Sequence, residues 1–340
     1  MVRRQLIGPA LLVALASGLL GSKAAAEAWF EFERSVEVTA PVDLELSLTA
    51  GKVYVTRGGT DRLVIEGIKR VWGHEWEDAR RIADLIQVDV KQGGDQVKII
   101  TNYLPLGDRD KSLRGKEFEG GAVHYGNVDY RITAPAFARI TILGQAAEVE
   151  VVSVEGDVTV ENGHGGFKGE SLVGAVKIRQ KSGDIELAGI EGPIDVDNGS
   201  GRTSGEFLFG PLTLRQGEGE ISLQWVEGDI RIKSLSSTVR IQQMRGAVDL
   251  ESENGDVYVK TELDSPRDFF VQTVSGRIVF SVPERSAGTL TMQSQSGVIA
   301  TELPVAVQAM TAHRLEGIIG RGGTRIELSS NSGDVTLAAY

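Results

Sequence analysis

A nine-residue phrase recurs along residues 138–263 and constrains the fold more than any other feature of the chain. Fourteen successive repeats begin with a small residue, in most cases glycine. The third and fifth positions of a repeat are apolar, mostly Val and Ile, with Thr203, Gly169 and Gly205 as exceptions, and the fourth is polar or amphipathic. Alternation with a period of two is typical of a strand that buries one face, and a leading glycine suits a tight corner. Each repeat therefore predicts one short strand and one corner.

The eighth position of the repeats indicates that the structural period is eighteen residues. Six alternate repeats carry an apolar residue there, whereas the repeats between them carry a polar residue or glycine, except for Leu235. The apolar set is Val154, Leu172, Ile190, Leu208, Val226 and Met244. An antiparallel meander has no reason to alternate its corners in this way, but a parallel solenoid does. We therefore expect an all-β protein, a parallel β-solenoid with two strands per 18-residue coil.

The outward charges agree with this register, because a parallel solenoid places residues eighteen apart side by side. Opposite charges would then be neighbours, and such cross-strand pairs stabilise a sheet by roughly 0.2–1 kcal/mol each. The expected neighbours are Arg231 with Asp249, Lys177 with Asp195, and Lys168 with both Glu150 and Glu186.

Composition limits the classes of protein and partner. The chain has 340 residues, 42 of them glycine and only 6% aromatic, which suits a β-repeat protein. It has no cysteine, which excludes disulfides, thiolate metal sites and a cysteine nucleophile. The net charge of −11 and the lack of a basic stripe argue against nucleic acid as a partner.

The first 26 residues have the pattern of a secretory signal peptide. Arg3 and Arg4 precede an apolar run at residues 6–20, and three alanines at residues 24–26 form a small-residue cleavage site. The apolar run is shorter than the roughly 20 residues that a membrane-spanning helix needs. We therefore expect export to the periplasm, the cell surface or the medium, with the signal peptide at residues 1–26.

Residues 27–137 are expected to form a β-rich N-terminal lobe, and residues 138–340 the solenoid repeat domain. The lobe contains one helix candidate at residues 75–86 and a hairpin with strands near residues 88–90 and 97–99. Trp72 and Trp76 are expected to pack the helix against the sheet, with ligand stacking as the alternative. The charged, glycine-containing loop at residues 105–126 is either a solvated excursion or a functional loop.

Several phrases resemble the DUF4097 family of adhesin-like bacterial proteins. Ser-Gly-Asp or Asn-Gly-Asp opens a strand at residues 182–187, 254–259 and 332–337, and Gly-Gly-x-x-Ile-x-Leu occurs at 322–328. Val-Asp-Tyr-x-Ile-x-x-Pro at residues 128–135 precedes the repeats. The resemblance implies a β-solenoid at the surface or envelope, and it implies no catalytic residues.

Calcium has to be considered, because nine residues is also the period of the calcium-binding β-roll. That fold binds the ion through Gly-Gly-x-Gly-x-Asp turns, and no turn here has that phrase. Each corner offers at most one aspartate after a glycine, and the favoured interpretation is an aspartate that accepts hydrogen bonds from turn amides. These aspartates are Asp157, Asp184, Asp229, Asp256 and Asp334.

Catalysis on a β-helix needs grouped carboxylates or basic residues on an outward face. Glu150, Glu186 and Asp195 are outward acids, but the expected charge rows account for them. The four histidines are scattered and form no metal or nucleophile motif. They are His74, His124, His164 and His313.

Gly169 and Gly205 lack an inward side chain, and they lie two coils apart in the same half of the repeat. They should therefore share a sheet. Phe167, Phe207 and Phe209 are expected to fill the space, and the alternative is a groove on that side.

The sequence thus predicts a non-enzymatic, adhesin-like scaffold of the envelope or cell surface. It predicts no catalytic residues, no metal site and no cofactor. The expected partners are a glycan or a protein, and the end strands are candidates for self-association because their edges need a cap or a partner. The alternative is a carbohydrate-active β-helix enzyme, a polysaccharide lyase or hydrolase.

Overall fold

The computed structural model describes residues 26–59, 61–73, 75–107 and 125–340. The expected signal peptide lies outside the described residues apart from Ala26, as do His74, His124 and most of the loop at 105–126. The chain forms two compact units. Unit 1 comprises Met1–Gly156 and Val160–Gly165, and unit 2 comprises Asp157–Thr159 and Gly166–Tyr340.

The described part of the chain is all-β with one helix and extensive parallel pairing. The elements that lie wholly in unit 1 are β1 Ala26–Glu37, β2 Val42–Arg57, β3 Arg62–Gly73, α1 Trp76–Leu85, β4 Ile86–Gly93, β5 Gln96–Tyr103, β6 Gly126–Ala134 and β7 Ala138–Val152. Strand β8, Val158–His164, contains residues of both units.

Unit 1 is built around β2, whose buried and outward residues alternate up to Ala50 and again from Val53. On one side β2 pairs in parallel with β7, and on the other side with β5 through its first half and β6 through its second. Strand β3 pairs antiparallel with both β1 and β6. The expected hairpin is confirmed, since β4 and β5 pair antiparallel with Gly93 opposite Gln96.

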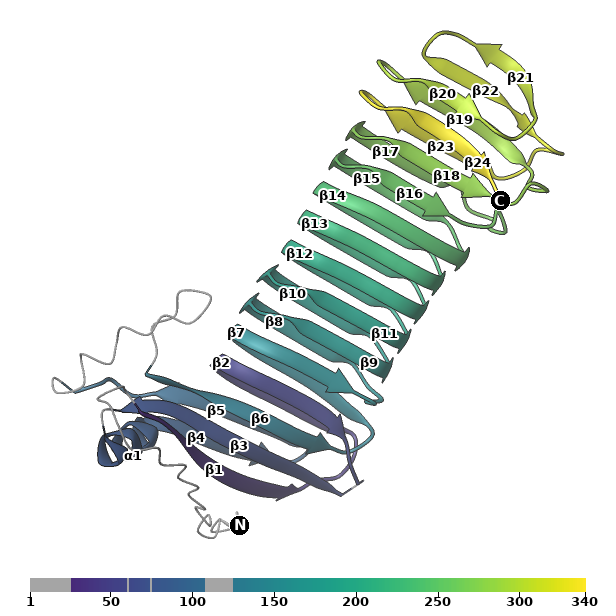
Figure 1. The fold of residues 1–340 in the computed structure, drawn as a ribbon. Helices are drawn as coiled ribbons and strands as arrows, with labels where there is room; N and C mark the ends of the chain where they lie inside the picture. Colours follow the sequence, from purple (N-terminus) through teal and green to yellow (C-terminus); the bar gives the residue numbers. More distant parts are fainter. Residues whose placement is uncertain (1–25, 60, 74, 108–124) are drawn as a thin grey trace. The chain divides into compact units, whose positions relative to one another are not determined.

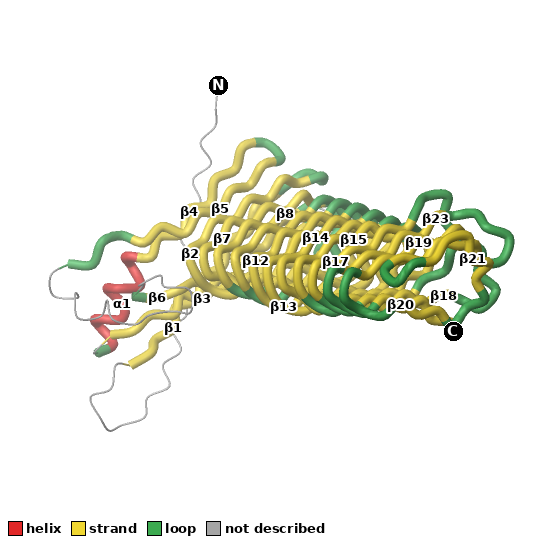
Figure 2. Tube along the Cα trace, turned by 90° about the horizontal axis from the view of Figure 1, so that it is seen from above, coloured by secondary structure: helices red, strands yellow, loops and turns green. Residues whose placement is uncertain are grey.

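The single helix of the described residues, α1, lies within one residue of the range expected from the sequence (Figure 2). It buries Ala79, Ile82 and Ala83, as its apolar periodicity predicts. Trp76 stacks on Phe30 of β1 with ring centroids 5.1 Å apart, which supports its expected packing role. With ten residues, α1 falls short of a membrane span, and the described ranges contain no other helix.

The described residues of unit 2 form strands and the turns between them, and they contain no helix. The strands are β9 Phe167–Val173, β10 Val176–Ser182, β11 Ile185–Glu191, β12 Ile194–Phe209, β13 Leu212–Glu227, β14 Ile230–Arg245, β15 Val248–Asn254, β16 Val257–Lys260, β17 Phe269–Ser275, β18 Ile278–Val282, β19 Gly288–Ser294, β20 Ile299–Thr301, β21 Val305–Met310, β22 Arg314–Ile319, β23 Arg325–Ser330 and β24 Val335–Ala339.

Parallel pairs between β9 and β16 join residues eighteen apart, as the repeat predicts, except at Val226. Val176 is the partner of Ile194, Ile185 lies between Phe167 and Thr203, and β12, β13 and β14 continue the same register side by side (Figure 1). Val158 donates its backbone N–H to the oxygen of Ala175, next to Val176. The inward Val, Ile and Leu of these strands are buried.

The end of unit 2 departs from chain order. Three extra residues shift the pairing from β15 to β17, where Asp249 is the partner of Phe270. The next neighbours of β17 and β18 are not β19 and β20 but the last two strands, β23 and β24. Strand β19 then pairs with the outer side of β23, and β22 and β21 follow antiparallel.

The corners alternate as expected, with one exception. Leu172, Ile190, Leu208 and Val226 are completely buried, but Met244 is 47% exposed. The β13–β14 pairing shifts at Val226, which lies opposite Gln243 instead. Gln243 therefore occupies the buried corner, where its Nε2 donates to the oxygen of Gly228 over 2.7 Å. The expectation for Met244 is wrong because a bulge displaces one residue.

Candidate functional site

An outward groove crosses strands β12, β13, β14, β15 and β17 of unit 2. Its volume is about 540 Å³, within the range of ligand pockets. In-register pairing aligns one residue from each strand into a column along it. The column is Asp197, Arg215, Lys233, Glu251 and Gln272. The strand period therefore presents a continuous row of polar side chains to a ligand.

The charges of the column change sign along the groove. Lys233 pairs with Glu251 over 2.9 Å, and Arg215 lies 3.7 Å from Asp195. Arg215 and Lys233 are direct register partners, although neighbouring like charges repel. The two basic side chains of the column therefore lie next to each other, flanked by the carboxylates of Asp197 and Glu251, and the amide of Gln272 ends the column on β17.

The edge of the groove combines glycines with exposed apolar side chains. Leu235 is 55% exposed and Val274 is 44% exposed. A Cβ at Gly217 would collide with the carbonyl oxygen of Gly199, so glycine is required for the close approach of these strands. The missing side chains keep this part of the groove open, and the groove offers both apolar and charged contacts.

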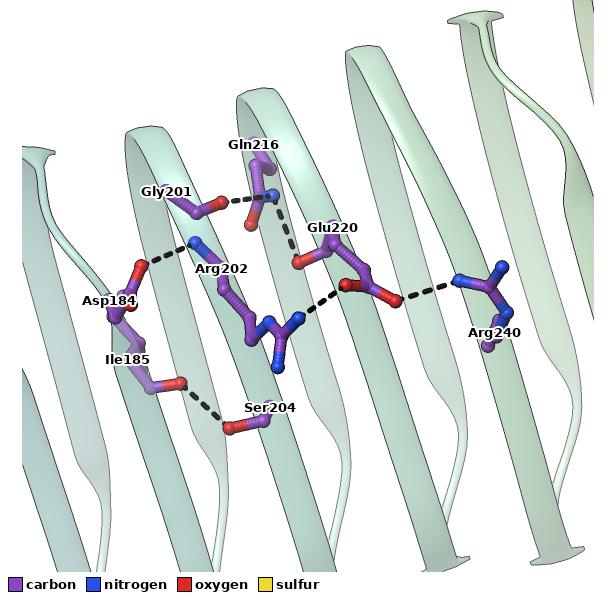
Figure 3. A network of polar contacts seen from close by, with 8 residues as sticks. All are labelled: Asp184, Ile185, Gly201, Arg202, Ser204, Gln216, Glu220 and Arg240. Carbon is purple, nitrogen blue, oxygen red and sulfur yellow. Dashed lines mark hydrogen bonds and ion pairs between the residues drawn. The ribbon is translucent and has the colours of Figure 1, made fainter.

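A second polar network lies on the second halves of β12, β13 and β14 (Figure 3). Glu220 accepts hydrogen bonds from Arg202 at 2.9 Å and from Arg240 at 2.7 Å, so one carboxylate joins three strands. The expected pair of Arg231 and Asp249 is confirmed at 2.9 Å. Lys177 is the register partner of Asp195 as expected, but the ion pairs of Asp195 are made by Arg179 at 2.6 Å and Arg215 at 3.7 Å.

The turn aspartates accept backbone hydrogen bonds, as the sequence interpretation favoured. Asp184 accepts the backbone N–H of Arg202, eighteen residues further on, at 2.8 Å (Figure 3). Asp157 accepts the backbone N–H of Ala175 at 3.1 Å, again eighteen residues further on. Asp229, Asp256 and Asp334 accept the N–H groups of Ala247, Arg277 and Val298. Each aspartate thus ties one corner to the next, and within the described ranges no group of three His or acidic residues is placed to hold a metal ion.

The outward acids considered for catalysis have uncharged or basic strand neighbours. Glu186 lies between Lys168 and Ser204, and Asp195 lies between Lys177 and Thr213. The register partner of Glu150 in unit 1 is Tyr54. A carboxylate pair that shares a proton is therefore not formed by these register neighbours. Of the described histidines, His164 is half-buried at the end of β8 and His313 is exposed.

The hydrogen bond from Arg179 holds the pKa of the Asp195 carboxyl below its ordinary value of 3.8. A lowered pKa in the folded state contributes stability above the unfolded pKa, and this contribution is lost as the pH falls through the folded pKa. We expect wild type to lose more stability than Asp195→Asn between about pH 6 and about pH 3. Urea denaturation of both proteins at the two pH values measures this. Equal losses would contradict it.

Gly169 and Gly205 share a sheet, as predicted, on either side of Leu187. No groove results, because both glycines are buried and the space is filled. A Cβ at Gly169 would lie 3.0 Å from Phe167, and one at Gly205 would lie 2.7 Å from Leu208. Phe167 fills the space as expected, but Phe207 and Phe209 are 47% and 40% exposed, so their expected inward role is wrong.

The groove residues were not singled out from the sequence, although a signal for them exists. The sixth position of alternate repeats is charged six times in succession, from Glu161 onward, and the last four of these residues line the groove. The six residues are Glu161, Arg179, Asp197, Arg215, Lys233 and Glu251. Alternation shows that they face outward, but it carries no information on the depth of the surface.

Comparison with known families agrees with this arrangement of repeated strands. The model of the family described as Toastrack DUF4097 matches residues 119–338. The chain belongs to this family. The DUF4097 match covers β6 to β23 and β24 except its last residue, and it includes the whole groove. No curated protein matches this DUF4097 chain.

Solved structures resemble the DUF4097 chain only distantly. One is described as a putative cell adhesion protein from Clostridium sporogenes, with 9% identity, coverage of 93% of this chain and 100% of that chain, and a TM-score of 0.21. A putative adhesin from Bacteroides fragilis has 15% identity, coverage of 91% and 97%, and a TM-score of 0.27. A putative lipid binding protein from Parabacteroides distasonis has 9% identity, coverage of 90% and 96%, and a TM-score of 0.35. TM-scores this low are not evidence of a shared function.

Proposed function

We propose that this DUF4097 protein is an exported, non-enzymatic, adhesin-like scaffold that binds a glycan or a protein at the cell envelope or surface. In this proposal the repeats form a β-solenoid with two strands per 18-residue coil. The observation that carries the binding role is the groove across five strands, with its charged column and its exposed Leu235 and Val274. Export is proposed from the signal peptide pattern at residues 1–26.

The repeated geometry favours an extended ligand over a compact one. Each strand contributes one outward residue to the column, so successive groups of a polymer meet successive side chains. Weak contacts that act together raise the overall affinity far above that of any one contact. The acidic net charge of −11 makes nucleic acid a poor ligand, as the sequence predicts.

The groove is tested by Leu235→Glu. This residue is exposed, so the change should leave folding intact while it places a charge on the apolar edge. We expect binding of the purified protein to isolated envelope fractions to fall about tenfold. Co-sedimentation over a range of envelope concentrations measures this.

Met310→Glu is the matched control, because Met310 is 70% exposed on β21, away from the groove residues. It should bind as wild type does. Equal losses in both variants, or none in either, would contradict the role of the groove. Release of reducing ends from the same envelope material by wild type would instead support the carbohydrate-active enzyme.

A further inference from the structure

One corner of unit 2 holds its residues in a left-handed backbone conformation. The seventh residue of alternate nine-residue repeats has a φ of 55° at Ser171, 63° at Gly189, 55° at Phe207 and 56° at Trp225. Glycine adopts this conformation freely, whereas bulky side chains rarely do. Phe207 and Trp225 therefore occupy backbone positions that disfavour them, and such outliers concentrate at functional sites.

The two aromatic rings are stacked on the outside of the corner. Their centroids are 6.4 Å apart and their planes differ by 9°. Phe207 is 47% exposed and Trp225 is 40% exposed, so neither ring belongs to the core. Exposed Phe209 follows two residues after Phe207. The corner thus presents an aromatic platform, defined by Phe207 and Trp225.

The strand on the other side of Phe207 carries a glycine at the same position. The register pairs Ala188 with Glu206 and Ile190 with Leu208, which places Gly189 beside Phe207. A Cβ at Gly189 would have only ordinary contacts, the nearest being to Ser171 at 3.8 Å. Phe207 therefore has a ring as neighbour on one side and a position without a side chain on the other, where a ligand with an apolar ring face has room.

The residues around the platform define the chemistry of the ligand. Glu206 and Gln224 are register partners on one side of the two rings. Phe209 and Glu227 are partners on the other, where Glu227 also pairs with Arg245 at 3.2 Å. Carboxylates repel phosphate and anionic lipid, which argues against nucleic acid and membrane surfaces. They accept hydrogen bonds well, and a sugar combines hydroxyl donors with an apolar ring face.

We propose that Phe207 and Trp225 are a stacking platform for the ring of a neutral sugar, with the sugar placed over Phe207 beside Gly189. Glu206 and Gln224 accept hydrogen bonds from its hydroxyls. This assignment rests on the proposed binding function and names a glycan as the ligand. The platform contains none of the groove residues, so the two surfaces are tested separately.

The test substitutes serine for each ring, because Ser171 already holds the same left-handed backbone position. Calorimetric titrations use the neutral hexasaccharides of glucose and of N-acetylglucosamine, with a galacturonic acid hexasaccharide as the anionic counterpart. Wild type should bind a neutral probe, and Phe207→Ser and Trp225→Ser should bind it about tenfold more weakly or worse. Phe207→Tyr keeps the ring and should retain binding. The anionic probe should bind more weakly than the neutral ones.

Leu235→Glu separates the two surfaces, since it should reduce envelope binding and leave the affinity for the neutral hexasaccharide unchanged. Thermal unfolding shows that each variant is folded. Failure of wild type to bind either neutral probe would overturn the platform, as would unchanged affinity in both serine variants. A dimer of wild type in sedimentation equilibrium that Phe207→Ser abolishes, without sugar binding, would assign the platform to contact between copies of the chain.

Discussion

Gly219→Ala is expected to destabilise the protein by about 3 kcal/mol or more. Gly219 has a φ of 127°, a region that side chains essentially do not occupy. A Cβ there would also collide with the carbonyl oxygen of Gly201 on the neighbouring strand. Backbone strain and steric overlap therefore add up, and the overlap can be relieved only if β12 and β13 separate. Urea denaturation followed by circular dichroism measures the loss.

Gly189→Ala is the matched control for the glycine prediction. Gly189 also has a positive φ, of 63°, but an added Cβ would have only ordinary van der Waals contacts. We expect a loss of about 1 kcal/mol, from the left-handed conformation alone. Equal losses at the two positions would show that strand contact is not what requires glycine at the corner of Gly219.

Gln216→Leu is expected to destabilise the protein by about 2 kcal/mol. Gln216 is buried, accepts the hydroxyl of Thr203 at 2.6 Å and donates to the oxygen of Gly201 at 3.0 Å. Leucine would leave the completely buried Thr203 hydroxyl without its acceptor. An unsatisfied buried hydroxyl carries its full desolvation cost, because the folded protein offers no water in exchange.

The double variant with Thr203→Val tests this explanation. Removal of both polar groups leaves no hydroxyl to satisfy, so the double variant should be about 1 kcal/mol more stable than the sum of the single losses predicts. The same urea denaturation, applied to all four proteins, gives the coupling. Additive losses would mean that the two side chains do not stabilise the fold through their mutual hydrogen bond.

The parallel register could be predicted because each strand repeats the same inward positions. Val176 pairs with Ile194, eighteen residues away, since this offset aligns the inward positions and also brings corners of the same kind together, whereas an offset of nine would bring the two kinds of corner together. The role of the turn aspartates was predictable for the same reason, because a corner every eighteen residues places an amide beside each carboxylate. The sequence thus contains the register and most of the buried apolar residues.

Features that depend on local departures from the repeat were not predictable. The spacing of Met244 is regular, yet the bulge opposite Val226 turns Gln243 inward instead. The placement of β23 between β17 and β19 depends on which strands compete for one edge, and periodicity carries no information on that. The groove was missed because it depends on two glycines of neighbouring strands, Gly199 and Gly217, that lie side by side only in the folded protein.

The constant offset between paired strands has a consequence for how such a gene can change in length. Strands β12 and β13 pair without a register shift and present the same kind of corner to each other, so in-frame deletion of eighteen residues across them leaves equivalent corners opposite each other. Duplication of the same eighteen codons would add one strand unit whose corners again match those of its neighbours. Unequal recombination can therefore lengthen or shorten the charged column without a change of the strand register, and the length of this column becomes a trait on which selection can act.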